Sequence, residues 1–113
     1  MRGKLEDLLS MCRKAGRLAL GHDSVKESVQ KRTAGIILFA EDVSPRTAEH
    51  IRRLAEQSGV RTLTLPLDMD GMQRLCGKRA GVAAVTDRGF AAALERLIPP
   101  PEQANTTEEE RSE

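Results

Sequence analysis

The sequence contains no tryptophan and no tyrosine, and only two of its 113 residues are phenylalanine. Proteins that bind single-stranded nucleic acid without sequence preference stack successive bases on aromatic side chains. Aromatic platforms also hold the unstacked bases of single-stranded RNA loops. The near absence of aromatic side chains therefore excludes a stacking platform from this chain.

Cysteine and histidine are also scarce, with two of each in the chain. Cys12 and Cys76 lack C-x-x-C spacing, so we expect both to be reduced, buried thiols that pack like small apolar residues. His22 and His50 belong to neither an H-E-x-x-H helix nor a serine elbow, and we place His50 on the surface. The sequence therefore predicts no metal site, no cofactor and no catalytic residue, and we expect a protein that is not an enzyme.

Long apolar runs are missing as well. None approaches the roughly 20 residues that span a bilayer, and the first residues lack the apolar core of a secretory signal. We therefore expect a cytoplasmic protein. A chain of 113 residues has the size of a single domain.

Charge is spread unevenly along the chain. The net charge is +1, but five glutamates against one arginine give residues 99–113 a charge of −4, which leaves +5 for residues 1–98. Three prolines open this acidic segment, and its other residues are too polar to compensate for the entropy lost on ordering. We therefore expect one domain over residues 1–98, followed by a disordered acidic tail over 99–113.

Within the domain, apolar residues alternate between helical spacing and short continuous runs. The pattern predicts helices near residues 5–15, 24–32, 45–58, 69–75 and 88–97. It predicts strands near residues 18–20, 36–40, 60–65 and 82–86. This alternating order indicates an α/β protein, a three-layer α/β/α sandwich with a four-stranded mixed sheet.

Short polar side chains stand where four of these helices should begin. Ser44, Asp68 and Asp87 are expected N-caps, and Ser24 with Glu27 three positions later predicts a capping box. The last helix is expected to bury four apolar side chains. These are Phe90, Ala91, Leu94 and Leu97.

Two acids follow the strand near residues 36–40, at a position where α/β proteins often place functional carboxylates. A small-molecule or nucleotide-binding enzyme domain would use Glu41 and Asp42 for this purpose. Alternatively, both acids cap the turn into the helix that starts after Ser44.

Glycine and basic residues gather in two segments far apart in the sequence. Gly21 opens the first, and Gly77 precedes Lys78 and Arg79 in the second. The second segment is not a P-loop, because five residues separate Gly71 from Gly77 and arginine follows the lysine. Basic residues flank both segments and indicate a surface for a polyanion. They are Arg13, Lys14, Arg17, Lys26, Lys31, Arg32, Lys78 and Arg79.

Four blocks of sequence resemble the kink-turn-binding ribosomal-protein family, the L7Ae and L30e group. The blocks match that family in order and spacing, and the small bacterial YlxQ-like branch is the most similar. They are residues 20–25 (LGHDSV), 34–42 (AGIILFAED), 75–78 (LCGK) and 82–87 (VAAVTD).

The resemblance implies an α/β/α sandwich that binds structured RNA with a sharp internal bend, and we expect the free protein to be a monomer. In the family, the start of the second helix enters the major groove at tandem sheared G·A pairs, and a later loop covers a flipped-out nucleotide. The residues implied for RNA binding are Gly21, His22, Asp23, Ser24, Lys26, Glu27, Lys78, Arg79, Ala80, Gly81 and Val82.

Three roles are expected within this set. The segment 21–24 would offer backbone amides and polar groups to base edges, and Lys26, Lys78 and Arg79 would neutralise phosphates. The segment 80–82 would pack on the extruded base.

Two acids depart from the family pattern. Asp23 and Glu27 stand where the family often has Asn or Lys, and a carboxylate can accept from a base amino group but cannot donate. These acids favour the alternative function, a protein-interaction module of the same fold with little affinity for RNA.

Overall fold

The structure is a computed structural model that describes residues 3–98. The predicted acidic tail, with the prolines that open it, lies outside the described residues. Five helices and four strands alternate along the described chain. They are α1 (Lys4–Lys14), β1 (Leu18–Leu20), α2 (His22–Gln30), β2 (Ile36–Phe39), α3 (Pro45–Ser58), β3 (Arg61–Thr64), α4 (Met69–Cys76), β4 (Val82–Val85) and α5 (Arg88–Leu97).

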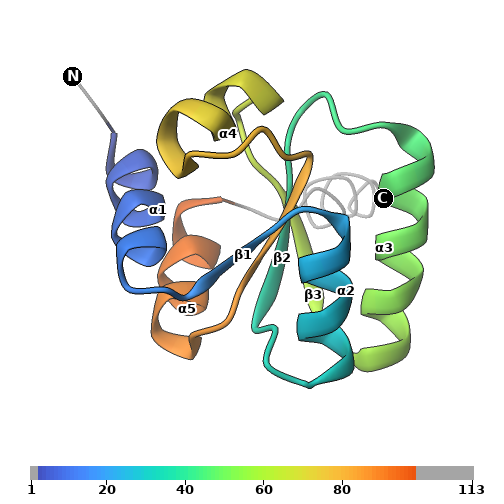
Figure 1. Ribbon diagram of the computed structural model, residues 1–113. Coiled ribbons are helices and arrows are strands. Elements are labelled where there is room, and N and C mark those ends of the chain that lie inside the picture. Colours follow the sequence, from blue (N-terminus) through green and yellow to red (C-terminus); the bar gives the residue numbers. More distant parts are fainter. Residues whose placement is uncertain (1–2, 99–113) are drawn as a thin grey trace, which may run out of the picture.

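The four strands form one mixed sheet in the order β1-β4-β2-β3. Strand β4 runs antiparallel to both of its neighbours, whereas β2 and β3 are parallel. Helices α1, α4 and α5 cover one face of the sheet, and α2 and α3 cover the other (Figure 1). The predicted three-layer sandwich is therefore confirmed. Within residues 3–98, none of the helices is both long and apolar enough to cross a membrane.

The apolar run of β2 is continuous because its side chains are buried on both faces of the sheet. Ile36 and Leu38 pack into the core under α1, α4 and α5, whereas Ile37 and Phe39 pack into the core under α2 and α3. Successive side chains of a strand point to opposite faces, and here both faces are covered by helices. All four side chains are buried.

Three of the four expected N-caps are confirmed. The side chains of Ser44, Asp68 and Asp87 accept hydrogen bonds from backbone N–H groups three residues later, in the first turns of α3, α4 and α5. These bonds satisfy amides that have no partner within their own helix.

The predicted capping box at Ser24 is wrong. Helix α2 begins at His22 with Gly21 as its N-cap, so Ser24 lies inside the first turn. Gly21 N–H donates to Val82 O, which extends the pairing of β1 with β4, and Gly21 O accepts the first helical hydrogen bond from Val25 N–H. With φ 96° and ψ 162°, Gly21 turns the chain from strand to helix in a single residue. A helix that starts this abruptly leaves no room for a cap at position 24.

The prediction that α5 buries Leu97 is also wrong, since the Leu97 side chain is 40% exposed. Ile98, the C-cap of α5, is buried instead. The backbone of Ile98 is extended, with φ −126° and ψ 107°, so the helical periodicity that predicted an inward Leu97 no longer applies there.

Both cysteines are buried free thiols, as expected. Burial raises the pKa of Cys12 to about 11 and also raises the pKa of Cys76. Both thiols therefore stay protonated near neutral pH, which suits packing side chains better than nucleophiles.

Candidate nucleic-acid interface

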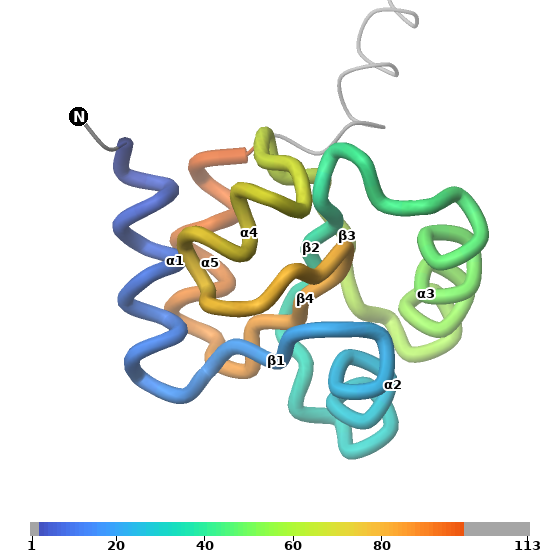
Figure 2. The backbone as a smooth tube through the Cα atoms, turned by 45° about the horizontal axis from the view of Figure 1, so that its top comes forward, coloured from blue at the N-terminus to red at the C-terminus, as the bar shows by residue number. Residues whose placement is uncertain are grey.

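The two glycine-containing turns, far apart in sequence, meet in space. Gly21 N–H donates to Val82 O over 2.9 Å, and the Lys78 ammonium donates to Leu20 O over 3.5 Å. Because β1 and β4 are antiparallel neighbours, the end of β1 lies beside the start of β4. Figure 2 shows the α4–β4 connection running beside the turn from β1 into α2. We call Arg13, Gly21–Ser24, Lys26 and Lys78 the two-turn surface. Of these, Arg13, Asp23 and Lys78 are exposed and the others are half-buried.

Lys78 lies directly over Gly21. A Cβ atom added to Gly21 would lie 3.3 Å from the Lys78 Nζ atom, so glycine lets the lysine approach the backbone closely. Lys78 itself is exposed, and its positive charge stands next to the start of α2. A cation and a helix N-terminus at one point form a local field that attracts anions.

The start of α2 adds hydrogen-bond donors to this charge. Among residues 3–98, no side chain caps the helix at Gly21. The first intrahelical bond of α2 is donated by Val25, so the amides of His22, Asp23 and Ser24 belong to the turn whose N–H groups have no helical acceptor. Such amides are suited to phosphate oxygens and to acceptor atoms on bases.

Arg13 contributes a cation from a third element. Gly77, in the left-handed conformation after α4 with φ 81°, leaves space that the Arg13 guanidinium fills. A Cβ atom on Gly77 would lie 2.6 Å from Arg13 Nη2. The sequence shows Arg13 only as one member of a basic cluster, because its position depends on the packing of α1 against α4.

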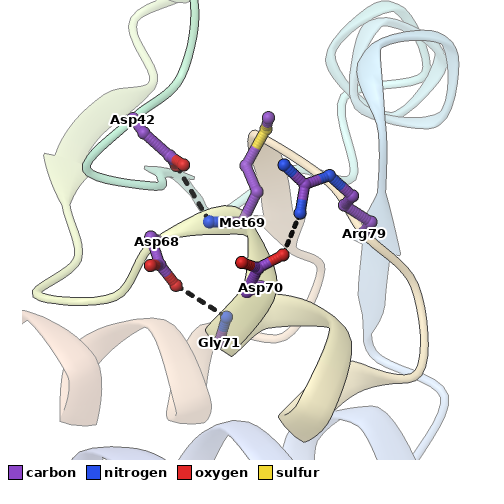
Figure 3. A network of polar contacts seen from close by, with 6 residues as sticks. All are labelled: Asp42, Asp68, Met69, Asp70, Gly71 and Arg79. Atoms are coloured by element: carbon purple, nitrogen blue, oxygen red, sulfur yellow. Dashed lines mark hydrogen bonds and ion pairs between the residues drawn. The ribbon is translucent and has the colours of Figure 1, made fainter.

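Arg79 points to a different neighbour. Its guanidinium forms an ion pair with the carboxylate of Asp70 in the first turn of α4 (Figure 3). The same turn is held by Asp68, which accepts from Gly71 N–H, and by Asp42, which accepts from Met69 N–H. The network joins the β2–α3 loop, the start of α4 and the loop before β4. Arg79 therefore anchors that loop, and its positive charge is paired with Asp70 within the protein.

The carboxylate of Asp42 thus accepts a hydrogen bond from the first residue of α4. The expectation that it caps the turn into α3 is wrong, because its Oδ1 atom accepts from Met69 N–H over 2.9 Å. Ser44 caps α3 instead. Sequence proximity favoured the nearer helix, whereas the fold places the start of α4 beside the end of β2.

The segment 80–82 is less accessible than its expected role requires. Ala80 is 5% exposed and Val82 1% exposed, since β4 is covered on both faces. Gly81 is half-buried, and a Cβ atom there would lie 3.0 Å from Val43 Cγ2. The side chains of Ala80 and Val82 therefore belong to the core.

The negative charge of Glu27 is compensated by a neighbouring lysine on the same helix. Its Oε2 atom lies 2.7 Å from Lys31 Nζ one helical turn away, and this contact lowers the pKa of Glu27. Both residues line an open depression of about 520 Å³ beside β1, and Lys78 is also among its lining residues. Since β1 is an edge strand, this depression continues the two-turn surface along the outside of the sheet.

His22 and His50 lie together in the structure, although 28 positions separate them in sequence. His22 is the first residue of α2, and His50 is an exposed residue of α3, as expected. Their rings are joined by a hydrogen bond of 2.9 Å between His22 Nε2 and His50 Nδ1. Within residues 3–98, no group of three or more histidine, cysteine or acidic side chains could hold a metal ion.

Comparisons with known proteins agree with this fold. Among solved structures, a protein of unknown function from Bacillus halodurans has a TM-score of 0.79 at 22% identity, covering 85% of this chain and 97% of that chain. The 15.5 kD RNA-binding protein of Giardia lamblia has a TM-score of 0.71 at 16% identity, covering 87% of this chain and 90% of that chain. Both similarities show that the fold is shared. The predicted YlxQ-like branch stays a prediction.

Sequence comparison identifies the family. The large ribosomal subunit protein eL8 of Haloquadratum walsbyi is 31% identical over 88 residues, which make up 75% of this chain and 72% of that protein. Residues 3–95 match the model of one family over nearly all of the described structure. The chain therefore belongs to the ribosomal protein L7Ae/L30e/S12e/Gadd45 family.

Proposed function

We propose that this protein is a non-enzymatic RNA-binding protein of ribosomal-protein type, and that it recognises structured RNA with a sharp bend through the two-turn surface. The observation that carries the proposal is the contact of Lys78 with the turn at Gly21, which places a cation beside the uncapped start of α2. The relatives add support, since one is a ribosomal protein and another an RNA-binding protein.

The roles follow from the chemistry of each group. Lys78, Lys26 and Arg13 neutralise phosphates, and the first amides of α2 donate to phosphate oxygens or base acceptors. The exposed Asp23 carboxylate accepts from a guanine or cytosine amino group. The backbone around Gly81 lies against a nucleotide displaced by the bend. Shape and backbone contacts therefore supply most of the recognition, as is usual for folded RNA.

Structural detail weakens both alternative functions. The anion at Glu27, which favoured a protein-interaction module, is paired with Lys31. The strand-end carboxylate of Asp42, which favoured an enzyme, is engaged with the backbone of α4. The other acid behind each alternative, Asp23 and Glu41 respectively, remains exposed.

A salt titration tests the proposal. The protein is expected to bind a bent, kink-turn RNA more tightly than a continuous duplex of equal length. With three to five phosphate contacts, log affinity should fall with log salt concentration at a slope of roughly −3 to −4. Fluorescence anisotropy with labelled RNA measures both quantities. Absence of RNA binding, together with salt-insensitive retention of a protein partner, would establish the interaction module instead.

A further inference from the structure

The histidine pair stands at the edge of the two-turn surface, and its two members are the only histidines in the chain. The ring centroids are 4.9 Å apart and the ring planes are inclined by 31°. The pair joins the first residue of α2 to the middle of α3. If protonation of a histidine affects ligand binding, that histidine must therefore be His22 or His50.

The ring of His22 lies between two hydrogen-bond acceptors. Its Nε2 atom is 2.9 Å from His50 Nδ1, and its Nδ1 atom is 3.5 Å from an Asp23 carboxylate oxygen. An imidazolium ion carries a hydrogen on both ring nitrogens, whereas a neutral imidazole carries only one. Both hydrogens of a protonated His22 would find an acceptor, provided that His50 carries its own hydrogen on Nε2.

Charged groups around the pair act in opposite directions. Strands β1 and β4, which pack against α2, contain no charged residue. On the helices, the charged residues within four positions of either histidine are Asp23 and Lys26 on α2 and Arg46, Glu49, Arg52 and Arg53 on α3. Lys78, after α4, contacts the turn at Gly21.

Asp23 beside His22 is negatively charged, whereas Lys26, Lys78 and the N-terminus of α2 are positive. On α3, Glu49 and Arg53 are paired with each other over 2.9 Å, so their charges largely cancel at the histidines. A phosphate group docked on Lys78 would add the anion that favours the protonated pair.

We propose that His50 is a positioning residue for His22, and that the pair takes up one proton from solvent when RNA docks on the two-turn surface. The inference rests on the proposed function. It also accounts for Asp23, whose negative charge at an RNA surface is offset by the imidazolium beside it.

The direction of the pH effect follows from linkage. RNA raises the proton affinity of the pair, so affinity for RNA is highest at the pH where the free pair is already protonated. It is lost progressively as the pH rises through the titration of the bound pair. Histidine titrates between about pH 5 and 8, and a shift of one pKa unit changes affinity by about tenfold. We expect affinity to be about tenfold higher at pH near 6 than at pH near 8.

The two cysteine thiols contribute little in this range. Burial places the pKa of Cys12 at about 11 and raises that of Cys76. The RNA itself can also bind protons. A variant with His22→Gln and His50→Gln measures that background with the same RNA, because both replacements keep a polar side chain but cannot titrate.

The experiment measures RNA affinity at constant ionic strength near pH 6 and pH 8, with proton uptake determined by calorimetry in two buffers of different ionisation enthalpy. Wild-type protein should take up about half a proton near the middle of this pH range, as a shift of one pKa unit implies. His50→Gln, which keeps an acceptor for His22, should retain the pH dependence. His50→Ala should reduce it, and the double variant should abolish it.

The outcomes separate the two proposals. If RNA binds equally well at both pH values, or if His50→Ala behaves like wild type, the histidine inference is overturned and the proposed function stands. If RNA binds at neither pH, the proposed function fails with it. Thermal unfolding of each variant identifies any loss of folded protein, which is not expected because His50 is exposed.

Discussion

Replacing Lys78 and Arg79 by glutamate is expected to weaken binding of a kink-turn RNA by about 100-fold at moderate salt. The Lys78 ammonium lies beside Gly21, where it faces the uncapped start of α2. Reversing its charge removes a phosphate contact and places an anion at that point. The salt dependence should become shallower by about one unit for each lost phosphate contact. Fluorescence anisotropy across a salt series measures both changes.

Lys78 and Arg79 should not contribute equally to this loss of RNA affinity. Arg79 is paired with Asp70, so Lys78→Glu alone is expected to account for most of the loss. Arg79→Glu alone would bring two carboxylates together beside α4 and loosen the loop before β4. Its effect on stability should therefore exceed its direct effect on RNA.

A charge-matched control is available at the far end of the same two strands. Arg17 precedes β1 and Arg88 follows β4, and both side chains are exposed. The backbone groups of Arg17 and Thr86 are hydrogen-bonded there. Arg17→Glu with Arg88→Glu changes the net charge by the same amount, and we expect a loss of RNA affinity of only a few-fold. An equal loss in both double variants would mean that net charge alone governs binding.

Gly21→Ala is expected to lower both stability and RNA affinity. The dihedral angles of Gly21, φ 96° and ψ 162°, lie in a region that essentially only glycine adopts, and occupying it with alanine costs about 1–3 kcal/mol. The added methyl group would also lie 3.3 Å from Lys78 Nζ and push the lysine away from the turn. Urea unfolding gives the change in stability, and anisotropy under folding conditions gives the change in affinity.

Gly59 provides the matched control for backbone strain. It also has a positive φ, 71°, but no atom lies within 4 Å of an added Cβ. Gly59→Ala should cost about 1 kcal/mol of stability through the left-handed backbone and leave RNA affinity unchanged. Wild-type RNA affinity in folded Gly21→Ala protein would contradict the placement of the turn at the RNA surface.

The element order and the layers could be predicted from sequence because they depend on local periodicity. The continuous apolar run of β2 indicates a strand covered on both faces, and both of its faces are indeed buried. The caps at Ser44, Asp68 and Asp87 could be predicted because a short polar side chain satisfies amides only a few residues away.

The features that could not be predicted depend on contacts between distant segments. The start of α2 at Gly21 follows from pairing with Val82, and the partner of Asp42 is the backbone of α4. The packing of Arg13 against Gly77 has the same origin. Periodicity and propensity carry no information about such partners. The resemblance to a family placed the two turns on one surface, but it did not predict the contact of His22 with His50, because His50 lies outside the motifs that carried that resemblance.

The central claim is that the start of α2 and the loop before β4 form one surface for RNA. NMR chemical-shift mapping of the uniformly labelled protein with a kink-turn RNA tests it most directly. The account predicts that the backbone amides of residues 21–26 and 77–82 shift together and saturate at the same RNA concentration, while those around Arg88 remain unchanged. Shifts confined to only one of the two turns, or centred on a different face of the sandwich, would contradict it.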